Sequence, residues 1–273
     1  MEPIIKVDNV SMCFNLSKEK HESLKEYFLA MVQGRLQYDE FYALKDVSLD
    51  IMPGDFYGLV GLNGSGKSTQ FQKLCDRLDG MGRGYRRLVF PQYDQPSSAL
   101  IRMYLGGEFG THPQDVSPYA ASAFYAVDRY ASWRKVWGED YKNGGLILAD
   151  RYTTSNAVHQ GAKCAPEERQ AFFRWLDEFE HDKLGLPRAD LVVYLDMPTE
   201  KAVELLRSRE ASTNTKADIH ELDTAYLAAC RACALQAAEQ LGWHMVHCLD
   251  DAGRLRSIED IHSEIWALVE KEL

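Results

Sequence analysis

The chain has 273 residues, a formal net charge of −10 and a pI near 5.3, and this acidic balance argues against nucleic acid as a main partner. Hydrophobic residues make up 45% of the chain, which is enough for a sizeable core. No apolar run reaches the ~18 residues that a membrane-spanning helix needs. The charged N-terminus also lacks the apolar region of a signal peptide, so we expect a cytoplasmic protein.

The N-terminal part of the chain predicts strands on either side of one helix. Residues 4–14 and 41–51 have the β-branched and aromatic content of strands, and residues 17–34 follow a helical pattern between them. The apolar stripe of that helix comprises Leu24, Tyr27, Phe28, Met31 and Val32. We expect the two strands to form only a marginal hairpin, which proteases cut first between Asn15 and Phe41. A third strand, residues 56–60, leads into a glycine-rich loop.

Helical and strand patterns alternate through the rest of the chain. Helices are predicted over residues 66–78, 96–106, 117–137, 166–184, 199–210 and 225–241, and from about residue 257. Strands are predicted over residues 86–90, 144–150, 189–197 and 244–248. This alternation predicts an α/β three-layer fold, in which helices cover both faces of a central parallel sheet, with a short β-rich extension at the N-terminus.

The six cysteines are expected to be reduced thiols, because the chain is long and carries no secretory signal. Two of them form the CxxC of Cys230 and Cys233, and His244, His247 and Cys248 follow. This spacing fits no common zinc module well, although a metal site remains an alternative. The Ala-rich helical pattern around the CxxC favours small residues that pack a helix.

The segment "GLNGSGKS" matches the phosphate-binding P-loop, G-x-x-x-x-G-K-[ST], and lies between a predicted strand and a predicted helix, as the motif requires. Its glycines let backbone N–H groups face the phosphates, Lys67 reaches the β- and γ-phosphates, and the Ser68 hydroxyl ligates Mg²⁺. The expected ATP-binding residues are Gly61, Asn63, Gly64, Ser65, Gly66, Lys67, Ser68 and Thr69. Such a loop concentrates donors locally, so an acidic protein can bind nucleotides.

Residues 1–69 resemble the start of an ABC transporter ATPase of the polysaccharide- and teichoic-acid-exporter type. The resemblance rests on "IIKVDNVSMCF", "SLKEYF", "ALKDVSLDIMPGD" and "GLVGLNGSGKST". It implies that an aromatic residue near Phe14 stacks on adenine. The LSGGQ-like motif, the hydrophobic strand ending in Asp-Glu and the switch histidine of that family are missing downstream. An exporter component that binds a membrane permease is therefore the alternative function, as is an ATP-binding protein without kinase activity.

From about Gly64 to Leu273 the chain resembles the thymidylate kinase family. The shared segments are "GKSTQFQKL", "VFPQY", "FYAVDRY", "ADRYTTSNAVHQGA", "DLVVYLDMPTEKAVELL" and "SIEDIHSEI". This resemblance implies transfer of the ATP γ-phosphoryl group to dTMP, with Mg²⁺, and allows a homodimer. We therefore divide the chain into an ABC-like segment, residues 1–55, and a kinase domain, residues 56–273, joined at the P-loop. The sequence leaves open whether this junction is natural recombination, engineering or an assembly error.

The kinase resemblance implies roles at the phosphates for Asp150 and Arg151, which match the family's Asp-Arg-Tyr motif. The carboxylate would assist Mg²⁺ and the arginine would bridge the phosphates. Arg207 and Arg209 precede the expected lid, "EASTNTKAD", and would neutralise the transferring group. The alternatives are a structural ion pair at Asp150 and solvated side chains at the two later arginines. The expected catalytic residues are Lys67, Asp150, Arg151, Arg207 and Arg209.

The same resemblance implies an acceptor site. Tyr125 would stack on thymine, and Arg129, four residues on along the same helix face, would bond the base. Tyr125 could also be a core residue. The expected acceptor residues are Asn63, Tyr93, Tyr125, Arg129, Arg151, Asn156 and His159. The sequence departs from the kinase pattern at Val60 and Asn63, where the family carries acidic residues, and at Gln92, where many relatives carry arginine.

Overall fold

The structure is a computed structural model that describes residues 5–17, 38–51, 54–213 and 224–273, with backbone alone before residue 54 and over 208–213. The chain divides into two units, Met1–Pro53 and Gly54–Leu273. In the first unit, β1 (Ile5–Ser17) pairs antiparallel with β2 (Tyr38–Ile51). The two predicted strands therefore form a hairpin longer than expected. The predicted helix over 17–34 falls outside the described residues, apart from Ser17 at the end of β1.

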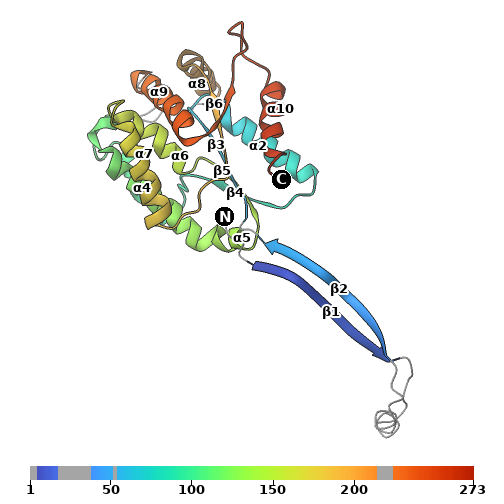
Figure 1. Ribbon diagram of the computed structural model, residues 1–273. Helices are drawn as coiled ribbons and strands as arrows, with labels where there is room; N and C mark the ends of the chain where they lie inside the picture. Colours follow the sequence, from blue (N-terminus) through green and yellow to red (C-terminus); the bar gives the residue numbers. More distant parts are fainter. Residues whose placement is uncertain (1–4, 18–37, 52–53, 214–223) are drawn as a thin grey trace, which may run out of the picture. The chain divides into compact units, whose positions relative to one another are not determined.

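The second unit is built on a five-stranded parallel sheet, which confirms the predicted α/β class (Figure 1). Its strands are β3 (Phe56–Gly61), β4 (Tyr85–Val89), β5 (Leu146–Asp150), β6 (Leu191–Asp196) and β7 (His244–His247). Their order is β4-β5-β3-β6-β7, so β3 is hydrogen-bonded on both sides. The strand that leads into the P-loop is thus the centre of the sheet.

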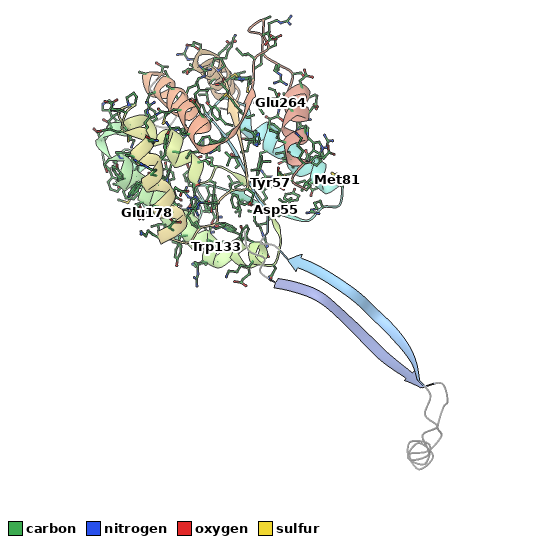
Figure 2. The ribbon with its side chains drawn as sticks, viewed as in Figure 1. Asp55, Tyr57, Met81, Trp133, Glu178 and Glu264 are labelled. Carbon is green, nitrogen blue, oxygen red and sulfur yellow. The ribbon has the colours of Figure 1, made fainter. Side chains whose placement is uncertain are left out.

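Alternate side chains of the strands point to opposite faces, and each face has its own core. Tyr57 and Leu59 pack with α2 (Lys67–Gly80) and α10 (Ile258–Val269). Val60 packs on the other face, where the covering helices are α6 (Thr153–His159), α7 (Arg169–Asp177) and α9 (Thr224–Leu241). Figure 2 shows Tyr57 inside this framework and Glu178 at the surface. Helices on both faces explain why β3, β5 and β6 are apolar along almost their whole length.

The remaining elements connect the strands. They are η1 (Pro96–Ser98), α3 (Ala99–Leu105), η2 (Pro113–Asp115), α4 (Pro118–Ser132), η3 (Trp133–Trp137), α5 (Gly138–Lys142), η4 (Gly161–Lys163), η5 (Glu178–Lys183) and α8 (Thr199–Thr213). Two predicted helices differ from the structure, because η3 and η5 are π-helical and interrupt them. Helix α6 was not predicted at all, since its seven residues are too few to show a helical period. Within the described part of the chain, every helix is too short or too polar to cross a bilayer.

The CxxC cysteines lie in the core, as the packing interpretation expects. Cys230 and Cys233 project from α9 into the core beneath α6 and α7, and burial raises the pKa of each thiol to about 12. Cys248 belongs to the core on the other face of the sheet. Among the described residues, no three His, Cys, Asp or Glu side chains are grouped so that they could hold a metal ion. Neutral thiols in two separate cores do not favour the zinc alternative.

Removal of residues 1–53 is expected to leave the second unit folded, because its sheet and its described core side chains begin at Phe56. Thermal unfolding followed by circular dichroism should then give a Tm within about 4 °C of the full chain, which corresponds to roughly 1 kcal/mol for a unit of this size. A matched chain that begins at Leu62 lacks β3 and should not fold. Failure of the chain that begins at Gly54 would show that the first unit is needed for stability.

Candidate active site

The P-loop connects β3 to α2 at the carboxyl edge of the sheet. Gly64 and Gly66 have φ angles of 85° and 84°, in the left-handed region that other residues rarely adopt. A Cβ on Gly64 would also lie 2.3 Å from the carbonyl oxygen of Ala202 on α8, so only glycine fits there. Lys67 is 6% exposed, and its Nζ donates to the Leu62 carbonyl at 3.1 Å. The loop is therefore shaped by its glycines, and its lysine is more buried than a typical surface lysine.

A cavity of about 490 Å³ surrounds the P-loop, and we call it the donor cavity. Its lining comprises residues 63–70, Asp150, Arg151, Met197, Leu205, Leu255, Arg256, Ile258 and Ile261. One end is polar, with the P-loop and Asp150, and the other is apolar around Leu255 and Ile258. Arg256 is held there by the His247 carbonyl at 2.8 Å and by Glu264 at 2.6 Å. Polar donors at one end and an apolar slot at the other suit a triphosphate and a base.

The apolar end was missed by the sequence analysis, which assigned adenine stacking to a residue near Phe14. Phe14 is a residue of β1 in the first unit, and its side chain lies outside the described ones. Among the described residues, this slot is formed by the segment between β7 and α10 and by the start of α10, which reach the P-loop because β7 and β3 end at the same edge of the sheet. Adenine stacking by an aromatic residue near Phe14 stays a prediction. The shared segment "SIEDIHSEI" begins here and includes Ile258 and Ile261, but it was given no role at the nucleotide, and the topology brings these residues to the site.

Two oxygen donors in the donor cavity suit Mg²⁺. The Asp150 Oδ1 is buried and has no hydrogen-bond partner among the described residues, and Ser68 lines the same cavity. Mg²⁺ is usually held by one or two carboxylates together with substrate phosphates and water, so a larger protein cluster is not required. These two residues therefore fit the ion that the sequence analysis expects.

A second cavity, of about 240 Å³, adjoins the first, and we call it the acceptor cavity. It is lined by Asn63, Phe90, Pro91, Tyr93, Leu105, Tyr125, Arg129, Arg151, Tyr152, Ser155, Asn156, His159 and Gln160. All seven residues expected at an acceptor site are among them, drawn from the P-loop, the segment after β4, α4, the turn after β5, and α6. Two of them, Asn63 and Arg151, also line the donor cavity.

Arg151 is the residue at the junction of the two cavities. Its φ of 67° lies in the left-handed region, a conformation that costs of the order of 1–3 kcal/mol for a residue other than glycine. This backbone turn follows β5 directly, and the Arg151 N–H donates to the Leu59 carbonyl at 3.3 Å. The side chain donates through Nη2 to the Asn63 Oδ1, and Nη1 lies 3.2 Å from the His159 Nε2. Arg151 thus connects the P-loop with α6.

The far end of the acceptor cavity is formed by α4 and α6. Tyr125 is half-buried and packs against the small core around Tyr104, so it lines the cavity and also contributes to the core. Arg129 is 2% exposed and makes two hydrogen bonds to Glu180, at 2.6 and 2.7 Å. Nothing in the sequence marks Glu180 as buried, because it lies in a stretch that is rich in charged residues.

A buried aspartate holds the segment that carries Tyr93. Asp128, on α4, accepts a hydrogen bond from the Gln92 N–H at 2.8 Å and another from the Ser97 hydroxyl at 2.6 Å. The segment after β4 is therefore tied to the helix that carries Tyr125.

The structure does not bring Arg207 to either cavity, since it is exposed on α8, and the side chain of Arg209 lies outside the described ones.

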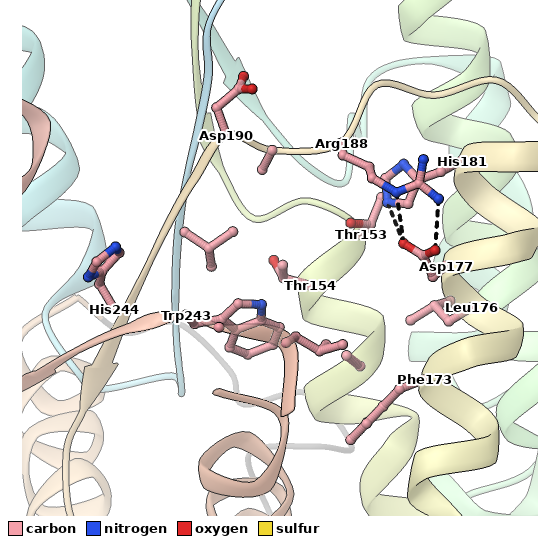
Figure 3. Close-up of a pocket in the computed structure, with 15 residues that line it drawn as sticks. Thr153, Thr154, Phe173, Leu176, Asp177, His181, Arg188, Asp190, Trp243 and His244 are labelled. Carbon is pink, nitrogen blue, oxygen red and sulfur yellow. Dashed lines mark hydrogen bonds and ion pairs between the residues drawn. The ribbon is translucent and has the colours of Figure 1, made fainter. Parts of the chain in front are cut away.

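A third cavity, of about 230 Å³, lies at the amino ends of β6 and β7 (Figure 3). Trp243 and Phe173 form part of its wall, and no P-loop residue lines it. Arg188, the one arginine among the described residues that line it, is already paired with Asp177 at 2.8 Å and with Asp182 at 3.0 Å, and Asp190 accepts from the Phe56 N–H at 2.8 Å. Ligands of open α/β sheets bind at the carboxyl ends of the strands, so the donor and acceptor cavities are the candidate active site.

Replacement of Lys67 by alanine is expected to abolish phosphoryl transfer from ATP, with a loss of at least about a thousandfold, because the ammonium group stabilises charge on the β- and γ-phosphates. The Tm should change little, since Lys67 belongs to none of the hydrophobic cores and its ammonium bonds a carbonyl of its own loop. Lys73→Ala, on the same helix and paired with Glu259 outside both cavities, is the matched control. Steady-state turnover of the two variants checks this, and near-normal activity of Lys67→Ala would place the active site elsewhere.

Comparison with known proteins agrees with this geometry. A family model described as thymidylate kinase matches residues 59–265. The thymidylate kinase of Mycobacterium tuberculosis strain H37Rv is 32% identical over 152 residues, covering 55% of this chain and 70% of that protein. A probable thymidylate kinase of Pyrococcus horikoshii is 30% identical over 224 residues, covering 81% and 98%. The solved structure of thymidylate kinase from Candida albicans superposes with a TM-score of 0.56 at 20% identity, covering 81% of this chain and 92% of that one. This chain belongs to the thymidylate kinase family.

Proposed function

We propose that the protein transfers the γ-phosphoryl group of ATP to dTMP and releases dTDP and ADP. One observation carries this proposal beyond family membership: the donor and acceptor cavities meet at Asn63 and Arg151, which line both. A phosphoryl group can pass directly between two nucleotides only if their phosphates meet at such a junction. The two nucleotides need different surfaces. The donor cavity offers the P-loop, and the acceptor cavity offers the aromatic ring of Tyr125 and the amide of Asn156.

In this proposal the residues of the donor cavity bind and neutralise the triphosphate. The P-loop N–H groups and the amino end of α2 hold the phosphates, and Lys67 adds a positive charge. Asp150 and Ser68 hold Mg²⁺, which supplies further charge neutralisation when bound. Arg151 lies where the donor and acceptor phosphates meet and provides a planar group of donors for their oxygens.

The acceptor cavity holds the monophosphate in the position for attack. The ring of Tyr125 stacks on the base, while Arg129 and Asn156 bond its polar edge. His159 closes the space beneath the sugar, and Tyr93 lies toward the acceptor phosphate. Each of these roles follows from the family resemblance and is supported by the shared cavity.

Four further expectations stay predictions. The ABC-like character of residues 1–69 and a cytoplasmic location are based on sequence patterns alone. A homodimer is supported by the apolar side chains that α3, α4 and η3 leave exposed, which are Leu100, Val127, Tyr130 and Val136. The roles of Arg207 and Arg209 in neutralising the transferring phosphoryl group also stay predictions.

The reaction is tested by single-turnover assays with ATP, Mg²⁺ and one monophosphate at a time. We expect dTMP-dependent release of ADP and formation of dTDP, with a lower kcat/KM for dUMP and dCMP. The Lys67→Ala protein is the negative control, because it should retain the acceptor cavity without the charge at the phosphates. ATP binding without transfer to any monophosphate would instead support an ATP-binding protein that is not a kinase.

The replacement Asn63→Asp is expected to raise kcat/KM for dTMP by about ten- to a hundredfold, because a charged acceptor adds roughly 1.5–3 kcal/mol to a hydrogen bond. The kinase resemblance implies an acidic residue at this position, which would accept from the deoxyribose 3′-hydroxyl. In the structure the Asn63 Oδ1 already accepts from Arg151, so a carboxylate would keep that contact and gain a second oxygen. Steady-state kinetics with each substrate varied in turn provide the measurement.

The ATP affinity serves as the internal control for this variant. The phosphate-binding groups are the loop backbone and Lys67, which Asn63→Asp leaves in place, so the KM for ATP should stay within about twofold. If dTMP kinetics were unchanged in an active enzyme, Asn63 would not face the acceptor sugar.

A further inference from the structure

Glu180 is a fully buried carboxylate that lines none of the three cavities described above, yet it binds two residues that line the acceptor cavity. Its Oε2 accepts from the Arg129 Nε at 2.7 Å, and its Oε1 accepts from the Arg129 Nη2 at 2.6 Å. Oε1 also accepts from the Asn156 Nδ2 at 3.1 Å. One buried carboxylate therefore holds both Arg129 and Asn156, at the end of the acceptor cavity that α4 and α6 form. We call this the base end.

These contacts decide which way the Asn156 amide faces. Both groups that the Nδ2 contacts are hydrogen-bond acceptors: the Glu180 Oε1, and the Ser122 carbonyl at 3.2 Å. A flipped amide would point its oxygen at two oxygens, which is repulsive, so the Oδ1 must face the other way. Asn156 lines the acceptor cavity, and its oxygen is therefore the atom available to a ligand.

The same contacts decide which edge of Arg129 can serve a ligand. The Nε and Nη2 edge of the guanidinium is used by Glu180 in a two-bond, side-on arrangement. The Nη1 end is left to donate into the cavity that Arg129 lines. The base end thus presents a donor from Arg129 beside an acceptor from Asn156.

Glu180 is placed by an element that contributes nothing else to the acceptor cavity. It lies in the π-helical η5, which follows α7, whereas Arg129 lies on α4 and Asn156 on α6. Its carbonyl accepts from the Leu186 N–H at 3.0 Å, and His181 bonds the Leu186 carbonyl at 2.8 Å. The turn that carries the carboxylate is therefore held by its own backbone bonds. π-Helical segments often occur where a functional side chain must be displaced from the regular helical position.

We propose that Glu180 is a positioning residue that makes the acceptor cavity selective for a 4-keto pyrimidine with a protonated N3. Such a base offers an acceptor at O4 to the Arg129 Nη1 and a donor at N3 to the Asn156 Oδ1. A 4-amino pyrimidine offers the reverse pattern and meets a donor with a donor and an acceptor with an acceptor. This inference rests on the proposed function, because it takes the base of dTMP to lie at this end of the cavity. A buried ion pair adds little net stability, because removing both charges from water offsets their attraction.

The test uses Glu180→Gln, which keeps the size of the side chain and removes its charge. An amide can accept at one of the two positions only, so Arg129 loses one of its two bonds in either orientation, and Asn156 loses its bond to residue 180 when the amide nitrogen takes the Oε1 position. We expect the KM for dTMP to rise about ten- to a hundredfold, because each bond lost is charge-assisted. The ratio of kcat/KM for dTMP to that for dCMP should fall by a similar factor, while the KM for ATP changes by less than about twofold.

Glu178→Gln is the matched control, since Glu178 lies two residues away in η5 and is exposed in an ion pair with Lys183. Glu180→Asp is the second variant, in case loss of the buried charge prevents folding. It keeps a charged partner for Arg129 but is one methylene too short to reach Asn156 as well. It should therefore fold, as judged by Tm, and still discriminate less well between dTMP and dCMP. Calorimetric titration of each protein with dTMP alone gives a readout that does not depend on turnover.

The outcomes separate this inference from the proposed function. Weaker dTMP binding and reduced selectivity, with ATP kinetics unchanged, support the positioning role. Equal loss of kcat with all substrates and an unaltered KM for dTMP, or a lower Tm alone, would make Glu180 a structural residue and overturn the proposal. If the wild-type protein neither binds nor phosphorylates dTMP, the proposed function fails, and the role given to Glu180 fails with it.

Discussion

Parallel pairing of β3 with β5 on one side and β6 on the other determines where every part of the site lies. The register sets Leu59 opposite Asp150, so the chain leaves β3 as the P-loop and leaves β5 as Asp150-Arg151 at the same edge of the sheet. Strand β4 pairs with β5 and brings the segment with Tyr93 to that edge. Residues more than eighty positions apart in sequence therefore meet, since parallel strands all end on one side.

Arg151 has a strained backbone at the point where the strands end, and its side chain contacts residues on both sides of that point. Its left-handed backbone is strained, and the structure tolerates it because the residue must turn immediately after a buried strand. The turn lets one guanidinium contact both Asn63 and His159 and so links the donor and acceptor cavities. The departure from the family pattern at Asn63 lies at this same point. Asn63 thus contacts the arginine to which the proposed function assigns the phosphates.

The acceptor cavity also depends on residues that stand outside it. Glu180 orients Arg129 and Asn156, and Asp128 ties the segment after β4 to α4. Both are carboxylates in a chain with many acidic residues, and both are almost completely buried. A buried carboxylate is stable only with hydrogen-bonding partners, and here the partners are parts of the site. The side chains of Arg129 and Asn156, which would hydrogen-bond a base, are thus held by buried contacts rather than by flexible surface ones.

The sequence by itself determined the P-loop, the alternation of helices and strands, and most residues of the acceptor cavity, because each is carried by a local motif or a local period. It could not reveal α6, whose seven residues are too few to show a period, or the π-helical interruption that places Glu180. It also could not locate the apolar slot around Leu255, or show that Arg207 lies away from both cavities. These features were decided by the tertiary structure, because burial and long-range contact depend on which strands are neighbours, and the order β4-β5-β3-β6-β7 is not written in any local pattern.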